Sequence, residues 1–485
     1  MIYFSDIFHV EEDDLEAHGA FNISLVNDLP LFIDPFLLYA SDKEEYQNLH
    51  SGIIRYLTFL KRKAQKGDLT DAKIARWYQF PEVKQVWFGY SQRGNCGAGL
   101  GKDFAKAMSC AIIGVFKDLN EEKITHTSHL EKLGLFQSGV GRDNISDFTC
   151  NLIKGYLLEY TQDFAQQYIN PIFCKEVSVP KAYFDYGLES WMPKTYLLPF
   201  YNGDYVLLTP KDLLTKDETW ISFADMKKDV FSIISTIPNE ELRDRMNDVY
   251  LRSLPTTPKE KDITYATENL IKQFPDFMDY YIKSKEEDCE GAIENSRKIV
   301  SDSNKVFVSN MRLLAELIYN HGYRYVSTQQ TLEAARERVL FMKDVIENKD
   351  GYKMFYLDGK PVKREKDLQL LFKFTWFNTE FDVNAEVNNG RGPVDYKISM
   401  GKYDSSLVEF KLASNTKLRQ NLLHQVEVYE KANDTKNSLK VIMYFTANEQ
   451  LKLYNILREL NLDNNPNVIL INAIDDKPSA SNVKN

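Results

Sequence analysis

The chain has 485 residues, of which 43% are hydrophobic and 27% are charged. These proportions are typical of globular proteins and exclude a wholly disordered chain or a fibrous repeat, and the length suffices for two or three domains. The 70 acidic residues outnumber the 60 lysines and arginines, which gives a formal net charge of −10. Because nucleic acid needs positive potential, this charge excludes a protein whose whole surface attracts nucleic acid, whereas a local basic groove stays open.

The five cysteines are widely and irregularly spaced, a pattern that fits neither a disulfide framework nor paired zinc ligands. The N-terminus runs directly into Glu11-Glu12-Asp13-Asp14 without a basic leader. No apolar run approaches the ~20 residues of a membrane span. We therefore expect a cytoplasmic protein without a membrane partner.

Composition and turn signals divide the chain into three predicted parts. Residues 1–255 combine helical and strand-like patterns and form a mixed α/β region, a candidate sensor or regulatory domain. Its clearest predicted elements are helices over residues 49–65, 102–120 and 145–169 and a strand over residues 205–209. Pro255 and Pro258 then interrupt the pattern. Residues 256–348 are predicted to be a helical middle segment, and residues 349–485 form the third part.

The third part alternates helices and strands in a clear order. Asp358-Gly359 predicts a hairpin-like turn, which is followed by a helix over residues 363–376. Three strands follow over residues 382–387, 394–400 and 407–413, and then come a helix over 416–432, a strand over 440–445, a helix over 448–460 and a strand over 468–472. The fold class is therefore α/β (α+β for the whole chain), with an α-β-β-β-α-β core, a mixed sheet and an extra α-β unit. In sheets of this kind we expect the site where strands diverge.

Three other signals are weak. The glycine cluster at residues 94–101 lacks the spacing of a phosphate loop, so we predict a turn that leads into a helix. Residues 138–147 combine glycines with N-cap residues, and we predict an ordinary helix start there, with contact to a nucleotide or peptide ligand as the alternative. His126 and His129 lack the partners of a zinc site, and we expect surface or loop histidines.

The informative chemistry lies on two predicted strands. Side chains alternate between the faces of a strand, so Glu409 and Lys411 share the face opposite Phe410. If these strands pair, Asp395 and Glu409 can converge on one divalent cation with the Lys411 ammonium beside them. Hard oxygen ligands suit Mg²⁺ or Mn²⁺, which polarises a phosphodiester and lowers the pKa of a bound water. A half-solvated amphipathic strand contains the same residue types, and that interpretation stays open.

Two flanking residues strengthen the functional interpretation. Glu365 places a carboxylate at the start of the preceding helix. Gln425 lies on or beside the buried stripe of the following helix, where an amide needs a hydrogen-bonding partner.

At these positions the sequence resembles the PD-(D/E)xK nuclease superfamily, the restriction-endonuclease-like fold, over residues 349–472. Asp395 resembles the motif aspartate, Glu409-Phe410-Lys411 resembles the (D/E)-x-K element, and Glu365 resembles the acidic residue of the first core helix. Gln425 resembles the glutamine of the Q-x-x-x-Y helix, with Tyr429 as its tyrosine.

The sequence departs from the family pattern at one point. Val394 separates Pro393 from Asp395. In addition, Glu386 on the preceding strand competes with Glu365 for the role of third carboxylate, so the resemblance leaves the third ligand open between them.

The resemblance implies Mg²⁺- or Mn²⁺-dependent endonuclease activity on nucleic acid, more often DNA than RNA, in bacterial defence against phage or foreign DNA. Asp395 and Glu409 would be metal ligands, with Glu365 as a third. Lys411 would activate water or stabilise charge, and Gln425 would support it. Four basic residues near the site could meet phosphates or could form a solvated face: Arg391, Lys397, Lys417 and Arg419.

Double-strand cleavage usually needs two active sites, so we expect a homo-oligomer. The alternative function is a catalytically silent protein with the nuclease fold, whose N-terminal region mediates binding or assembly.

Overall fold

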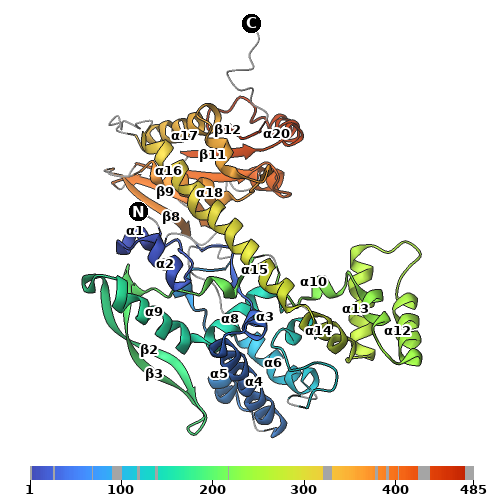
Figure 1. Cartoon of the computed structure of the whole chain (residues 1–485). Coiled ribbons are helices and arrows are strands. Elements are labelled where there is room, and N and C mark those ends of the chain that lie inside the picture. Colours follow the sequence, from blue (N-terminus) through green and yellow to red (C-terminus); the bar gives the residue numbers. More distant parts are fainter. Residues whose placement is uncertain are drawn as a thin grey trace. The chain divides into compact units, whose positions relative to one another are not determined.

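The computed structural model (Figure 1) describes residues 3–25, 28–67, 69–89, 101–116, 119, 121–136, 140–216, 218–320, 330–376, 379, 381–388, 393–401, 404–423 and 437–475. The mixed α/β class is confirmed, because helices are accompanied by several sheets, one of them mixed and five-stranded. The chain divides into two compact units, Met1–Ser301 and Asp302–Asn485. The predicted middle segment 256–348 consists of helices and turns in its described residues, but it is divided between the two units and does not form a third one.

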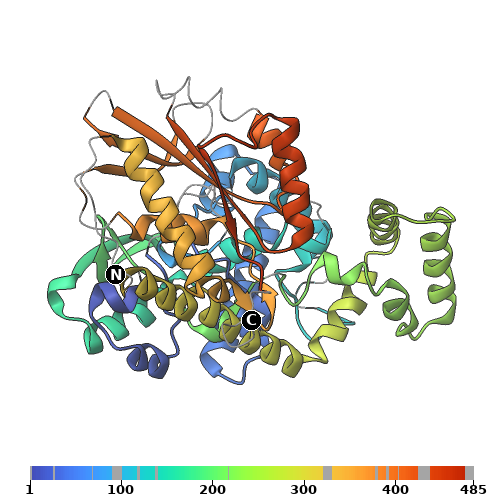
Figure 2. The same cartoon turned by 90° about the horizontal axis from the view of Figure 1, so that it is seen from above.

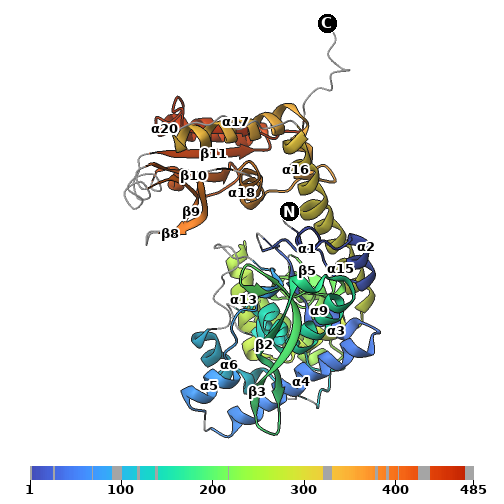
Figure 3. The same cartoon turned by 90° about the vertical axis from the view of Figure 1, so that its left-hand side faces the viewer.

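The first unit is mostly helical and carries a long hairpin. Its helices are α1 (Phe4–Phe8), α2 (Glu12–His18), α3 (Pro35–Ala40), α4 (Glu44–Gln65), α5 (Asp71–Trp77), α6 (Lys102–Val115), α7 (Lys132–Phe136), α8 (Arg142–Leu152), α9 (Lys154–Tyr168), α10 (Phe223–Met226), α11 (Val230–Ser235), α12 (Glu240–Arg252), α13 (Glu260–Gln273) and α14 (Phe277–Glu286), and α15 (Cys289–Asn304) contains the boundary. Its strands are β1 (Phe32–Ile33), β2 (Cys174–Asp185), β3 (Ser190–Tyr201), β4 (Asp204–Tyr205) and β5 (Leu214–Thr215). Figure 3 shows the antiparallel β2–β3 hairpin, and β3 packs against α9.

Helix α4 illustrates how the sequence builds this unit. Its buried residues recur at helical spacing, among them Tyr46, Ile53, Leu57 and Leu60, and they form one apolar stripe. This stripe faces the core, where α4 packs against α3 and α6. The predicted helix over residues 145–169 is divided at Ile153 into α8 and α9.

Residues 206–209 of the predicted strand 205–209 lie outside any ladder. The N–H groups of Val206 and Leu207 donate to the carbonyl oxygens of Pro199 and Gln85, both at 2.9 Å, so these buried amides are paired in an irregular segment.

The second unit contains a five-stranded sheet in the order β12-β11-β10-β9-β8. Its strands are β8 (Asp382–Asn388), β9 (Pro393–Met400), β10 (Asp404–Leu412), β11 (Ser438–Tyr444) and β12 (Val468–Asn472), and a separate hairpin joins β6 (Tyr356–Leu357) to β7 (Lys360–Pro361). Strands β8, β9 and β10 are antiparallel, whereas β10, β11 and β12 are parallel. All five predicted strands are present, within three residues of their predicted bounds.

The hairpin turn at Asp358-Gly359 is also confirmed, with positive φ angles of 50° and 71°. Two left-handed residues suit the tight turn between paired strands.

Helices cover both faces of this sheet. They are the π-helix Lys305–Ser309, α16 (Asn310–Asn320), α17 (Thr331–Asn348), α18 (Glu365–Phe374) and α20 (Ala447–Glu459), and residues 418–423 are helical as well. On one face, Phe372 of α18 contacts the rings of Tyr396 and Phe410, each with its centroid at 5.3 Å. Viewed from above, α17 (yellow-orange) and α20 (red) lie on opposite sides of the strands (Figure 2).

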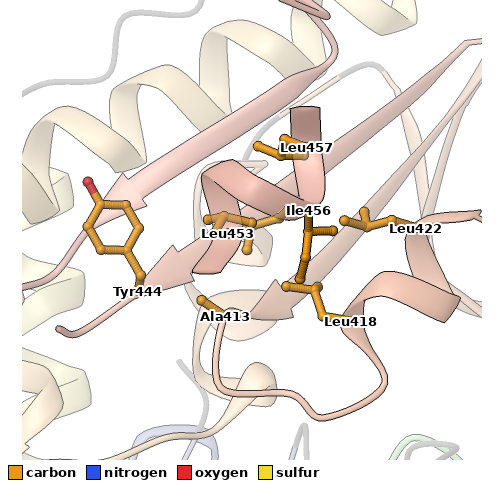
Figure 4. Close-up of a cluster of buried hydrophobic side chains, with 8 residues drawn as sticks. Ala413, Leu418, Leu422, Tyr444, Leu453, Ile456 and Leu457 are labelled. Carbon is orange, nitrogen blue, oxygen red and sulfur yellow. The ribbon is translucent and has the colours of Figure 1, made fainter. Parts of the chain in front are cut away.

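The opposite face carries an apolar cluster (Figure 4). Leu453, Ile456 and Leu457 of α20 meet Leu418 and Leu422 from the preceding helical segment. Ile442 and Tyr444 of β11 complete the contact from the sheet. Burial of these side chains fixes α20 and the segment 418–423 against the face of β10 that also carries Glu409 and Lys411.

The helices of the described ranges are too short or too polar to cross a membrane.

Candidate functional site

The candidate site lies where β9 and β10 diverge. The ladder between these antiparallel strands extends from Asp404 and Met400 to Val408 and Tyr396, where it ends. Asp395 is the next residue of β9, and its Oδ2 accepts a hydrogen bond from the N–H of Phe410 at 2.6 Å. The Asp395 carboxylate thus takes the place of a backbone acceptor at the point of divergence. The pairing of the two strands, on which the sequence argument depended, is present.

Register brings further polar residues into line with Asp395. Because Val408 pairs with Tyr396, the next residues, Glu409 and Asp395, lie on neighbouring strands on the opposite face of the sheet. On its other side Glu409 pairs with Lys440 of β11, a largely buried lysine. A row of charged positions therefore crosses β9, β10 and β11.

Glu386 is aligned with this row at the backbone level. Its neighbours Ala385 and Val387 pair with Tyr396 and Val394, which puts the Glu386 backbone opposite Asp395. The Glu386 side chain lies outside what the structure describes, so the choice between Glu386 and Glu365 as third carboxylate stays open.

Lys411 connects the two carboxylates nearest to it. Its Nζ lies 3.8 Å from Glu365 Oε2 and 3.8 Å from Asp395 Oδ2, and it donates to the carbonyl oxygen of Phe410 at 3.0 Å. All three charged side chains are largely buried, so their attraction is screened less than that of surface pairs. The predicted proximity of Asp395 and Lys411 is therefore present.

Glu365 is held by additional donors. It is the first residue of α18, where the helix dipole favours a negative charge. Its Oε1 accepts from the N–H of Leu412 at 3.3 Å and from Nδ2 of Asn415 at 3.2 Å. These contacts tie the start of α18 to the end of β10. In this arrangement Glu365 is the partner of Lys411 and of two amide donors.

Burial is the main cause of the raised pKa values of the Asp395 and Glu409 carboxyl groups. It raises the pKa of Asp395, and the Lys411 ammonium and the Phe410 N–H oppose this rise. It raises the pKa of Glu409 to about 7, opposed by Lys411 and increased by the charge of Asp395. Keeping both carboxylates ionised therefore requires positive charge nearby. Carboxyl groups with perturbed pKa values gathered in this way are typical of functional sites, although structural ion pairs produce the same effect.

The donor set fits one class of metal site. Among the residues that the structure describes, no three or more His, Cys, Asp or Glu side chains gather as metal ligands. Mg²⁺, however, commonly binds proteins through only one or two carboxylates and completes its shell with water and substrate phosphates. Asp395 and Glu409 supply two such hard oxygen donors.

Sequence reasoning missed two contributors to this site. The Gln369 side chain forms a hydrogen bond with Asp395 that favours the carboxylate form. Gln369 lies one helical turn after Glu365, and this spacing alone could have indicated it. The charge of Lys440 lowers the pKa of Glu409. Lys440 became recognisable only from the parallel register between β10 and β11.

The predicted basic contacts differ in their surroundings. Lys397 lies two residues after Asp395 on the same face of β9 and is partly buried, whereas Lys417 is exposed. Arg419 donates through Nε to Oε2 of Glu459 on α20 at 3.0 Å, an exposed ion pair that a phosphate would have to displace. Arg391, Gln425 and Tyr429 fall outside the described residues.

The weaker sequence signals have mixed outcomes. The glycine cluster lies mostly outside the described residues, and α6 begins directly after it at Lys102. Helix α8 begins at Arg142 after an N-cap at Gly141. Arg142 pairs with Glu218 at 3.4 Å.

His126 and His129 both lie in the loop that precedes α7, as expected, but they differ in exposure. His126 is exposed, but His129 is buried and its Nε2 lies 2.9 Å from Oε1 of Glu286 on α14. The same carboxylate accepts from the N–H groups of His126 and Thr127. The segment is thus anchored to the core by a residue far away in the sequence.

Two family models match the chain. Residues 9–222 match a domain of unknown function, DUF8370, and residues 331–447 match another domain of unknown function, DUF8371. The second match contains Asp395, Glu409, Lys411 and Glu365. Neither a curated protein nor a solved structure matches the chain. The resemblance to the PD-(D/E)xK superfamily therefore stays a prediction from the sequence.

Proposed function

We propose that the second unit is a divalent-cation-dependent nuclease that hydrolyses phosphodiester bonds of nucleic acid, with DNA preferred over RNA. One observation carries the proposal. The Lys411 ammonium lies 3.8 Å from both Asp395 and Glu365 at the divergence of β9 and β10, and Glu409 occupies the adjacent strand position. A lysine and buried carboxylates at one sheet position are the groups that phosphodiester hydrolysis needs.

Each residue has a chemical role in this proposal. Asp395 and Glu409 would hold Mg²⁺ or Mn²⁺, which when bound supplies Lewis acidity toward the phosphate and a more acidic water. Lys411 donates to a phosphate oxygen or to the attacking water and offsets negative charge in the transition state. Glu365 keeps the Lys411 side chain in place, and Gln369 keeps Asp395 ionised and oriented.

The test is a cleavage assay with the full chain. Linear and circular DNA and single-stranded and structured RNA are incubated with Mg²⁺ or Mn²⁺, with and without chelator. Asp395→Ala and Lys411→Ala should each lower cleavage by about 100-fold or more, because each removes a group in contact with the reacting atoms. Lys452→Ala, which alters an exposed lysine on α20, should leave cleavage unchanged. Equal activity in all four proteins would refute the assignment.

A second candidate is favoured by the position of Lys411. Because its ammonium already lies between two carboxylates, the site is partly neutralised by its own chain. A catalytically silent protein that binds nucleic acid or assembles through its N-terminal region would retain such an arrangement for stability. Titration calorimetry with Mg²⁺ separates the two candidates. Metal binding that is lost in Asp395→Ala favours the nuclease, whereas nucleic-acid binding without metal binding or cleavage favours the silent protein.

Three further expectations come from the sequence and have no support from the geometry of the site. They are a role in bacterial defence, a homo-oligomeric state and a cytoplasmic location. A phage-challenge assay with wild type and Asp395→Ala tests the first. Light scattering at concentrations where cleavage occurs tests the second, and a monomer there would contradict it. Cell fractionation tests the third.

A further inference from the structure

The first unit contains a cavity of about 480 Å³ that the proposed function leaves unused. It is lined by α2, by the first turn of α4, by α9 and by residues 210–212. This volume falls within the range of ligand pockets, roughly 300–1,000 Å³. All of the lining residues lie inside the segment that matches DUF8370.

Three tyrosines form one wall of this cavity. Tyr156 and Tyr160 are one turn apart on α9, and their rings stack with centroids 5.9 Å apart at 26°. The ring of Tyr46 from α4 meets Tyr156 edge-on, with centroids 6.1 Å apart at 86°. Aromatic faces attract cations through their negative quadrupole, and they do so most strongly where water is excluded.

Carboxylates outnumber cations along the lining. The lining contains four carboxylate residues and only two lysines, Lys43 and Lys211. Lys211 pairs with Glu16 and Glu159 pairs with Lys194, and both partners lie outside the lining. Three carboxylates, Glu45, Asp163 and Asp212, then face one lysine, Lys43. His18 adds no compensating charge, because burial lowers its pKa below the usual value. The cavity is therefore a region of negative potential.

The chain itself already binds an ammonium group at this wall. Lys43 Nζ lies 4.5 Å from the centroid of the Tyr46 ring and 2.6 Å from Asp212 Oδ2. Tyr46 Oη donates to the other oxygen of Asp212 at 2.7 Å, which fixes the carboxylate. Lys43 is about half exposed, so an incoming ammonium can compete with it for the same tyrosine and carboxylate.

We propose that this cavity binds a small organic cation, a primary diamine or longer polyamine, between the tyrosine wall and the carboxylates. One ammonium group takes the position on Tyr46 and Asp212 that Lys43 now holds. A second is directed toward Glu45, whose Oε1 also lies 3.4 Å from the Tyr156 hydroxyl. An anion is disfavoured by the excess of carboxylates, and an uncharged ligand would not offset that excess.

The test uses the full chain and titration calorimetry with 1,4-diaminobutane and spermidine. The uncharged analogue 1,4-butanediol and inorganic phosphate serve as controls and should not bind. Glu45→Gln should weaken diamine binding by about threefold. Tyr156→Ala should weaken it by about fivefold. Lys43→Gln should strengthen it by about threefold, because the competing ammonium is removed.

Glu44→Gln is the matched control, since Glu44 precedes Glu45 on α4 and does not line the cavity. It should bind like wild type. The gain with Lys43→Gln keeps the test valid even if Tyr156→Ala fails to fold, because misfolding cannot increase affinity. Binding of butanediol or phosphate as strong as that of the diamine would overturn the proposal. The proposal would also be overturned if no diamine binding were detected at diamine concentrations up to about 10 mM, because even a weak site has a dissociation constant in the millimolar range.

Discussion

Replacing Glu409 by Gln should stabilise the metal-free second unit at alkaline pH. The carboxyl group lies beside Asp395 in a buried row of the sheet, and burial raises its pKa from the ordinary 4.5 to about 7. Above pH 7 the folded unit must therefore hold an ionised carboxylate that is better solvated in the unfolded chain. Glutamine preserves the shape of the side chain and removes this charge.

The magnitude follows from the shift in pKa. One pKa unit corresponds to about 1.4 kcal/mol, so the rise from 4.5 to about 7 costs at most about 3–4 kcal/mol. The folded state binds more protons than the unfolded state between pH 4.5 and 7. The contribution of Glu409 to the free energy of unfolding is therefore fully present below pH 4.5. It falls as the pH rises through 7 and stays constant at higher pH. Relative to wild type, Glu409→Gln should gain about 2–3 kcal/mol between pH 5 and pH 8.

Urea unfolding of the full chain at pH 5 and pH 8, in chelator, measures this gain. Hydrogen exchange of peptides from β9 and β10 identifies the transition that belongs to the second unit. Glu333→Gln, which changes an exposed glutamate at the start of α17, is the control and should shift stability equally at both pH values. A Glu409→Gln effect that is the same at pH 5 and pH 8 would refute the idea that this carboxylate is ionised at a cost. Added Mg²⁺ should stabilise wild type more than the variant.

Other residues give predictions of the same kind. Lys411→Met should raise the pKa of Asp395 further, because this ammonium is the main charge that opposes burial, and carboxyl-detected NMR titration measures it. Glu286→Ala should destabilise the first unit by about 3–5 kcal/mol in thermal unfolding, because the His126 N–H and the His129 ring lose their shared acceptor. The control Glu287→Ala changes an exposed residue and should cost less than about 0.5 kcal/mol. Arg338→Ala should cost about 3 kcal/mol, because the buried guanidinium donates to the carbonyl oxygens of Thr375 and Ala334; a melting temperature equal to that of wild type would contradict it.

Alternation of side chains made the sheet of the second unit predictable. Runs such as Val408-Glu409-Phe410-Lys411-Leu412 have period two and are bounded by turn residues, so both the strands and their inner faces follow from local pattern. The division into units did not follow, because the boundary after Ser301 falls inside α15, ten residues after its single glycine, Gly291, and with no proline nearby. Pro255 and Pro258, by contrast, separate helices of one unit. Turn residues identify loops, and only long-range packing distinguishes a loop within a unit from one between units.

The part of the candidate site that depends on the alternation of side chains along a strand was predictable. Glu409 and Lys411 share a face because they are two residues apart, and this needs no tertiary information. The pairing of Glu409 with Lys440 depends on the register between parallel strands that are about thirty residues apart, which no local pattern specifies. The burial of His129 could not be predicted for the same reason, since the carboxylate that permits it belongs to Glu286.

The charges of the candidate site explain how a chain with a net charge of −10 could bind nucleic acid. Of the described side chains that the contacts above bring together, Glu365, Asp395 and Glu409 carry three negative charges against the two positive charges of Lys411 and Lys440. This group is negative when Glu409 is ionised and then repels a phosphodiester. A divalent cation reverses this sign and leaves one positive charge, which one phosphate neutralises. Because the proton on Glu409 competes with the cation near pH 7, nucleic acid should bind this unit only when metal and neutral-to-alkaline pH occur together. An acidic protein can thus bind a polyanion at one place without a basic surface elsewhere.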